Sequence, residues 1–293
     1  MNDFQALPVP ASTVGESPLW HPTEQVLYWC DIVGRQLNRF DPATHEHRAW
    51  RFDSEPTCCA PARDGTLLLA RRDGLWRFDP ATGSNTPLCE PPYDPRVERF
   101  NDGKAGPDGA LWVGTIYEPR DRAAASLYRW ANGTLARVAG DMTVSNGLGF
   151  SPDGATMYWS DTWGHTHYTM GTATPSERRV LRTFPRREPG SPLDTYGGRP
   201  DGATVDAEGN LWVAMFEGAR LLRLSPEGEI LQTLHLPVRC PTMPCLGGPD
   251  LRTLYITTAR ENRTPEELAA MPLSGRVLQL RVDVPGLPAN FVD

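Results

Sequence analysis

One phrase, a turn followed by a short strand of alternating Leu, Tyr, Trp and Val character, occurs six times along this chain of 293 residues. Two copies read GPDGALWVGTI and SPDGATMYWSDT, and the six begin at His21, Ala62, Gly106, Ser151, Asp206 and Gly248. The starts are 41, 44, 45, 55 and 42 residues apart, which is typical of one four-stranded sheet per unit. Any fold proposed for the chain must therefore contain six similar units.

A second phrase, x-L-x-R-F-D-P, follows most copies, and only the fourth copy, around His165, is degenerate. The 27 Gly and 29 Pro residues agree with many turns and few long helices. A two-sheet sandwich also has many short strands, but it gives no reason for one phrase to return six times. We therefore predict an all-β fold, a six-bladed β-propeller with four-stranded blades, as a single domain over residues 1–293.

Two segments depart from the repeat. Thr264-Pro265-Glu266-Glu267 has the pattern of a helix start, with Thr264 as N-cap and Glu267 completing a capping box, and predicts a short helix inserted in the sixth unit. The segment from Phe4 to Val14 precedes the first unit and has no other partner. We expect it to pair as an outer strand with the last blade and to cover an exposed sheet edge.

Charge and composition exclude several classes of partner. The formal net charge is −7 and no basic block is present, which argues against nucleic acid. No apolar run approaches the roughly 20 residues that span a bilayer, and the first 20 residues lack the features of a signal peptide. The six cysteines form no CxxC pair. We expect a reduced cytoplasmic protein, a monomer or small homo-oligomer, without a membrane partner.

Oxygen-bearing side chains recur at one register of the repeat. The residues five positions before each turn are Glu16, Thr57, Asn101, Asn146, Asp201 and Met243, and four of the six carry a carboxylate or amide oxygen. In a propeller these segments form the innermost strands, so the four side chains would converge on the central channel. Asn and Asp before Gly are also common turn residues, but Glu16 is not a turn former and occupies the same register.

Converging carboxylates need a counter-ion, because an unpaired buried charge is costly. A divalent cation would supply it. Oxygen ligands suit Ca²⁺, Mg²⁺ or Mn²⁺, and the absence of His and Cys from the set argues against a structural zinc site. Three protein ligands would leave coordination positions for water or substrate, as in catalytic metal sites.

The chain resembles the SMP30/gluconolactonase/LRE family over essentially its whole length. The resemblance rests on Gly15-Glu16-Ser-Pro, Arg99-Phe-Asn101-Asp-Gly-Lys104, Ser145-Asn146-Gly-Leu, Arg199-Pro-Asp201-Gly-Ala and the segment from Gly247 to Arg260. It implies a six-bladed propeller that hydrolyses sugar lactones with one divalent metal ion, for which Ca, Mg, Mn, Zn and Fe all stay open.

The resemblance also implies roles for individual residues. Glu16, Asn146 and Asp201 would bind the metal, with Asp201 also the general base. Arg99 and Asn101 would contact the substrate, and Glu118 is the nearest match to a further acidic residue of the family, with a register uncertain by one residue. Lys104, the one lysine among 29 basic residues, lies in the same motif, so we expect it in the substrate site.

These residues lead to a hypothesis: metal-assisted opening of an aldonolactone to the aldonic acid. Asp201 would take a proton from the attacking water and Arg99 would offset the developing negative charge. Two alternatives stay open. One is a non-catalytic calcium-binding propeller, which gains nothing from a guanidinium beside its site. The other is a phosphotriesterase-type hydrolase on the same fold.

The fourth unit is about ten residues longer than the others and contains Arg178, Arg179, Arg182, Arg186 and Arg187. The simpler interpretation is a solvated outer strand. The alternative is that the following loop, from Gly190 to Arg199, folds over the mouth of the channel, where Arg199 or its neighbours would bind an anionic group on the sugar.

Overall fold

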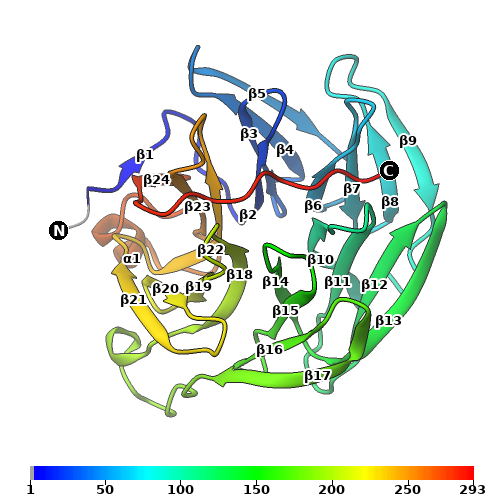
Figure 1. Ribbon diagram of the computed structural model, residues 1–293. Helices are drawn as coiled ribbons and strands as arrows, with labels where there is room; N and C mark the ends of the chain where they lie inside the picture. The colour runs from blue at the N-terminus through cyan, green and yellow to red at the C-terminus, as the bar shows by residue number, and fades with distance from the viewer. Residues whose placement is uncertain (1–2) are drawn as a thin grey trace.

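The computed structural model describes residues 3–293 and confirms the predicted fold. Six four-stranded antiparallel sheets are arranged as blades around a central channel (Figure 1). The first blade consists of β2 (Gly15–His21), β3 (Val26–Asp31), β4 (Gln36–Asp41) and β5 (Glu46–Arg51). The second consists of β6 (Pro56–Pro61), β7 (Leu67–Arg71), β8 (Gly74–Phe78) and β9 (Asn85–Cys89). The third consists of β10 (Glu98–Ala105), β11 (Leu111–Tyr117), β12 (Ala125–Ala131) and β13 (Thr134–Met142).

The next two blades are β14 (Ser145–Phe150), β15 (Thr156–Asp161), β16 (Thr166–Gly171) and β17 (Thr174–Thr183), then β18 (Arg199–Val205), β19 (Leu211–Phe216), β20 (Arg220–Leu224) and β21 (Ile230–His235). The sixth consists of β22 (Cys240–Gly247), β23 (Thr253–Ala259), β24 (Leu278–Arg281) and β1 (Gln5–Ala6). A short 3₁₀ helix, η1 (Leu193–Thr195), lies between β17 and β18. None of the helices within residues 3–293 is long and apolar enough to cross a membrane.

Both chain ends close the ring. β1 pairs antiparallel with β24, which confirms the predicted outer strand, and Leu7 and Val9 behind it are buried. After β24 the chain crosses one face of the propeller to the second and third blades (Figure 1). There Val292 donates its N–H to the carbonyl of Pro61, and Asp293 donates its N–H to that of Gly109. The two ends thus tie blades together that are far apart in sequence.

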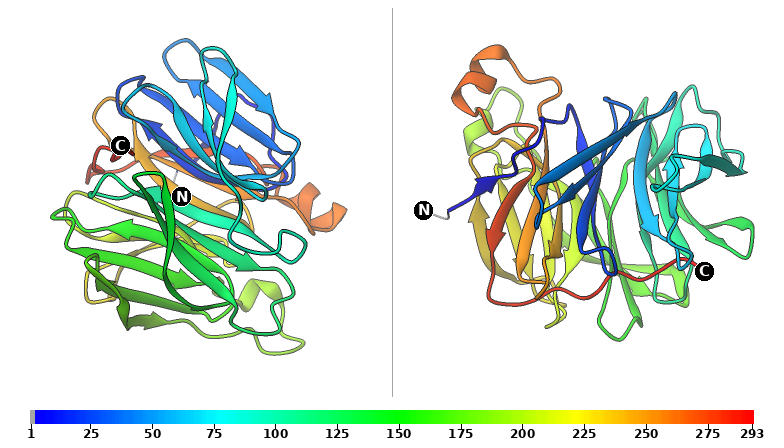
Figure 2. Two further views of the ribbon diagram at one scale, coloured as in Figure 1. Left: turned by 90° about the vertical axis from the view of Figure 1, so that its right-hand side faces the viewer. Right: turned by 90° about the horizontal axis from the view of Figure 1, so that it is seen from above.

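The predicted helix is α1 (Pro265–Ala270), and the Thr264 hydroxyl accepts a hydrogen bond from the Glu267 N–H at 3.2 Å, as expected for an N-cap. The Glu267 carboxylate lies instead near two guanidinium groups, 3.7 Å from Arg239 and 3.8 Å from Arg263. In Figure 2 (right), α1 and the C-terminal segment lie at opposite faces of the propeller. These two segments therefore mark the two ends of the channel.

The core lies between neighbouring blades. One cluster joins Trp112 of the third blade to Phe150 and Trp159 of the fourth, and another joins Trp212 of the fifth blade to Leu254 of the sixth. Large aromatic side chains fill the wedge between twisted sheets, so each blade is held by its neighbours.

A β-bulge interrupts every innermost strand. The pairing register shifts after Glu16, Pro56, Phe100, Asn146, Pro200 and Pro241 in β2, β6, β10, β14, β18 and β22 respectively. A bulge adds a residue on one strand and redirects the neighbouring side chains. Because the bulge recurs in every blade, the predicted oxygen-bearing residues occupy the same position of their innermost strands. In the sixth blade the residue that reaches the site is Thr242, one position before the predicted Met243.

Candidate active site

A cavity of about 210 Å³ opens at the end of the channel where β23 leads into α1; we call it the mouth cavity. It is lined by five residues that the sequence predicted for the site: Glu16, Arg99, Asn101, Asn146 and Asp201. Four of these five come from the bulged part of an innermost strand, and Arg99 precedes the bulge of β10. The structure therefore brings together residues that are up to 185 positions apart in the sequence.

The three predicted metal ligands lie on three different blades and are nearly buried, with exposed fractions of 9% for Glu16, 4% for Asn146 and 6% for Asp201. The Asn146 amide donates to Oδ1 of Asp201 at 2.5 Å and to the Thr162 hydroxyl at 2.9 Å. Its own Oδ1 is buried and has no hydrogen-bond partner. A buried acceptor without a donor indicates that something outside the chain completes the site.

Two carboxylates of the mouth cavity, those of Glu16 and Asp201, are removed from solvent. Burial raises the pKa of Glu16 well above its usual range, and the nearby charges of Asp201 and Asp102 raise it further. Burial also raises the pKa of Asp201, against the effect of Arg199. Desolvated carboxylates that face one another favour protonation or a bound cation. The donor set thus fits a divalent cation.

The chemical type of the ligand atoms limits which cations the site can bind. Among residues 3–293, no three His, Cys, Asp or Glu side chains form a group that could hold a metal. The third side-chain donor beside Glu16 and Asp201 is then the Asn146 amide oxygen. An all-oxygen set of this kind suits hard cations such as Ca²⁺, Mg²⁺ and Mn²⁺.

Arg99 is held at the edge of the cavity. Its guanidinium donates to Oδ1 of Asn101 at 2.9 Å and lies 3.5 Å from Glu118. Arg72 donates two hydrogen bonds to the Glu118 carboxylate, at 2.8 and 3.0 Å. Burial lowers the pKa of Arg99, and Glu118 opposes that effect. Glu118 does not line the mouth cavity but contacts Arg99, which does, and the sequence did not point to Arg72 at all.

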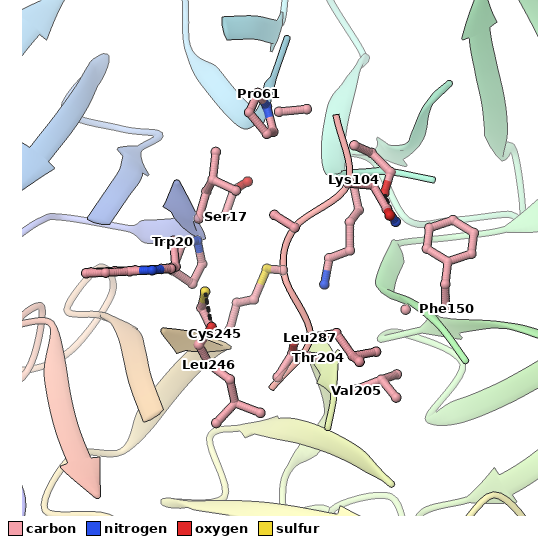
Figure 3. A pocket seen from close by; sticks show the side chains of 18 of the residues that line it. Ser17, Trp20, Pro61, Lys104, Phe150, Thr204, Val205, Cys245, Leu246 and Leu287 are labelled. Carbon is pink, nitrogen blue, oxygen red and sulfur yellow. Dashed lines mark hydrogen bonds between the residues drawn. The ribbon is translucent and has the colours of Figure 1, made fainter. Parts of the chain in front are cut away.

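Lys104 lies elsewhere. It lines a second pocket of about 110 Å³ at the opposite end of the channel, together with Ser17, Cys245 and Leu287 of the C-terminal segment (Figure 3). Its ammonium group donates to the carbonyl of Ala203 at 2.9 Å. A strand rises about 3.3 Å per residue, so a residue three positions after Asn101 lies roughly 10 Å further along the channel. Lys104 therefore does not line the mouth cavity, and its place in the substrate site stays a prediction from the sequence.

Several lining residues were missed because they lie on loops after the second strand of a blade. Trp163 is 40% exposed at the mouth, with the Arg120 and Arg199 guanidinium groups 5.5 and 5.8 Å from its ring. Glu217 pairs with Arg199 at 3.2 Å and with Arg263 at 3.0 Å. Loops carry no periodic pattern that marks such residues in the sequence. However, the second strand of each blade ends at the face of the mouth cavity, so the residues that follow these strands could have been predicted as lining residues.

Comparison with known proteins places this geometry in a family. The sequence model of one protein family, the SMP-30/gluconolactonase/LRE-like region, matches residues 14–260 of this chain. The chain is 46% identical to a 6-deoxy-6-sulfogluconolactonase of Pseudomonas putida, covering 94% of this chain and 93% of that protein. It is 34% identical to a pentonolactonase of Haloferax volcanii, covering 84% and 81%.

A solved structure has the same fold. The crystal structure of a calcium-binding protein, regucalcin, from Agrobacterium tumefaciens superposes with a TM-score of 0.90 at 28% identity, covering 100% of this chain and 98% of that one. The matched region includes every blade and the whole predicted ligand set. The chain belongs to the SMP-30/gluconolactonase/LRE-like family.

Proposed function

We propose that this protein hydrolyses a sugar lactone and that the reaction depends on one divalent cation held by Glu16, Asn146 and Asp201. The observation that carries the proposal is the mouth cavity itself, in which two desolvated carboxylates and an unpartnered amide oxygen lie beside the guanidinium of Arg99. The lactonase names of two relatives support the choice of substrate class.

The reaction is the hydrolysis of a cyclic ester. Water forms a bond to the carbonyl carbon, the bond from that carbon to the ring oxygen breaks, and the ring oxygen leaves as a hydroxyl group. When bound, a divalent cation supplies polarisation of the ester carbonyl and a lower pKa for water. Asp201 accepts the proton of the attacking water and can return it to the ring oxygen.

The other side chains orient and stabilise. Asn146 holds Oδ1 of Asp201 by a hydrogen bond, which leaves the second carboxylate oxygen for water. Arg99 offsets the negative charge that develops on the former carbonyl oxygen. Asn101 and Glu118 fix the position of that guanidinium through direct contacts. Trp163 offers an exposed aromatic ring at the mouth, a surface on which the apolar face of a sugar can stack.

Arg99 also favours this proposal over non-catalytic calcium binding, the alternative that the similarity to a calcium-binding regucalcin suggests. A positive side chain beside a cation site weakens cation binding, whereas it stabilises an anionic transition state. The cytoplasmic location and the monomeric or small homo-oligomeric state stay predictions from the sequence.

A continuous acid-release assay tests the proposal. The protein is stripped with a chelator and supplied in turn with Ca²⁺, Mg²⁺, Mn²⁺, Zn²⁺ and Fe²⁺, over a panel of aldonolactones and one phosphotriester. We expect cation-dependent acid release from lactones. Full activity after chelation would refute the role of the metal. If the protein binds a cation but hydrolyses no lactone with any cation, the non-catalytic calcium-binding alternative is favoured. Turnover of the phosphotriester alone would favour the phosphotriesterase-type alternative.

A further inference from the structure

A side pocket of about 230 Å³ adjoins the mouth cavity on the side of the fourth and fifth blades. It shares Trp163, Arg199 and Glu217 with the mouth cavity, so the two hollows lie side by side. The remaining lining residues are His165, Arg186, Arg187 and Tyr196. A substrate bound at the mouth can therefore extend a substituent into the side pocket.

The extra length of the fourth unit builds this pocket. The chain between β17 and β18 is anchored at both ends: the Phe184 N–H donates to the carbonyl of His165, and the Tyr196 hydroxyl lies 3.4 Å from Nε2 of the same histidine. Arg220 donates to the carbonyl of Gly197 at 2.9 Å. The segment is thus part of the packed structure.

Three of the five arginines of this unit, Arg178, Arg179 and Arg182, lie on β17, and the other two lie past its end. Arg178 and Arg182 contact backbone carbonyls of the neighbouring blades, those of Gly140 and Gly228, as expected for an outer strand. Arg186 and Arg187 lie past the end of β17 and line the side pocket. Only the first group fits the simpler interpretation of a solvated outer strand.

The side pocket has an excess of positive charge. Arg199 is already paired with Glu217 at 3.2 Å, but the ion pairs of residues 3–293 include neither Arg186 nor Arg187. Both Nε and Nη2 of Arg187 donate to the carbonyl of Ser191, and no acidic side chain of residues 3–293 pairs with its Nη1. The chain as a whole carries a net charge of −7, so this local surplus is opposite in sign to the protein's overall charge.

His165 gives two further indications. Burial, and then the charges of Arg186 and Arg199, lower the pKa of His165 to about 4, so the imidazole is neutral at pH 7 and its surroundings are positive. The side chain is 7% exposed, and its Nδ1 is buried without a hydrogen-bond partner. An unpartnered polar atom beside unpaired guanidinium groups is a site that lacks its ligand.

We propose that the side pocket is a subsite for an anionic tetrahedral group, a sulfonate or a phosphate, carried by the sugar lactone. The inference rests on the proposed lactonase function and adds a substrate class to it. Guanidinium groups present paired donors that match the oxygens of such a group, and Arg186 and Arg187 have donors to spare. Tyr196 and His165 would complete the set of hydrogen bonds.

The test compares three lactones of one ring: neutral gluconolactone and its derivatives with a sulfonate or a phosphate at C6. The variant is Arg186→Gln/Arg187→Gln, and the matched control is Arg179→Gln, an exposed arginine of β17 outside the pocket. We expect the wild type to favour an anionic lactone through a lower KM. The double variant should reduce the ratio of kcat/KM for anionic against neutral lactone by roughly tenfold or more, and the control should keep it.

The outcomes separate this inference from the proposed function. Hydrolysis of neutral lactone with no preference for either anionic lactone, or a ratio unchanged in the double variant, overturns the subsite and leaves the lactonase proposal standing. No hydrolysis of any of the three lactones overturns the lactonase proposal instead. If the double variant does not fold, two measurements replace it: the same ratio in Arg186→Gln alone, and the salt dependence of the wild-type preference for anionic lactone. A preference for anionic lactone that does not fall with rising salt contradicts the subsite. A larger effect with one anion identifies the group that is bound.

Discussion

The amide nitrogen of Asn146 lies 2.5 Å from Oδ1 of Asp201, across the junction of the fourth and fifth blades. Both residues are in the bulge region of an innermost strand, so the contact depends on how the two blades pack and on nothing local in the sequence. It leaves the Asn146 oxygen without a partner and one Asp201 oxygen for chemistry. In the proposed mechanism, this pair joins the metal-binding role to the general-base role.

Asp201→Asn keeps the shape of the side chain and removes its charge. We expect turnover of a lactone to fall by about 100-fold or more, because the attacking water loses its base. The cation-free variant should melt at a higher temperature than cation-free wild type, since one desolvated carboxylate next to Glu16 is gone. Wild-type turnover in this variant would contradict the proposed mechanism.

Cation binding should stabilise the fold. Adding Ca²⁺ or Mn²⁺ to the stripped protein should raise the melting temperature, because a ligand present at 100 times its Kd contributes about 2.7 kcal/mol. Glu16→Gln should remove most of this shift. The matched control is Glu46→Gln, an exposed carboxylate on β5 that pairs with Arg48 at 2.7 Å, and it should keep the full shift. An equal shift in both variants would rule out Glu16 as a ligand.

Arg72 should act on the reaction through Glu118 and Arg99. Arg72→Met removes the two hydrogen bonds that fix the Glu118 carboxylate, so Arg99 loses its fixed partner. We expect kcat to fall by about tenfold with unchanged cation affinity, and partial recovery in Arg72→Lys. Arg77→Met serves as the control, because Arg77 of β8 pairs with Asp64 and does not line the mouth cavity. A loss of cation affinity in the Arg72 variant would show a general structural effect instead.

Lys104 should matter for stability and little for substrate binding. Burial lowers the pKa of Lys104, and the charge of Asp102 opposes that effect, so the two buried groups compensate each other. Lys104→Met should reduce the free energy of unfolding by about 1–3 kcal/mol in urea titrations, because Asp102 loses its counter-charge. The KM for the lactone should stay near the wild-type value. A KM raised tenfold or more would return Lys104 to the substrate site.

The fold could be predicted because each blade repeats the same turn and strand pattern. The position of Glu16, Asn146 and Asp201 could be predicted because the bulge repeats with it. That Lys104 lies outside the mouth cavity could not be predicted, because the sequence does not show how far along the channel each residue of a strand lies. Arg72 was missed because its partner, Glu118, belongs to another blade, and such pairings depend on the packing of loops.

His167 should make the protein less stable in acid. Its side chain is fully buried, neither ring nitrogen has a hydrogen-bond partner, and burial lowers its pKa to about 3. In the unfolded chain a histidine has a pKa of about 6.5. Between these two values the unfolded state binds a proton that the folded state does not, so the free energy of unfolding falls as the pH decreases, by about 1.4 kcal/mol per pH unit.

The comparison of wild type with His167→Leu isolates this contribution, because the raised carboxylate pKa values of the mouth cavity are common to both proteins. Urea unfolding at saturating Ca²⁺ between pH 4 and pH 7 measures it. The variant should lose about 1.4 kcal/mol per pH unit less than wild type over the acidic part of this range, since leucine binds no proton. His235→Gln, on the exposed outer strand β21, should follow the wild-type curve. Parallel curves for wild type and His167→Leu would mean that His167 is protonated, or hydrated, in the folded protein, and that burial is not what controls its charge.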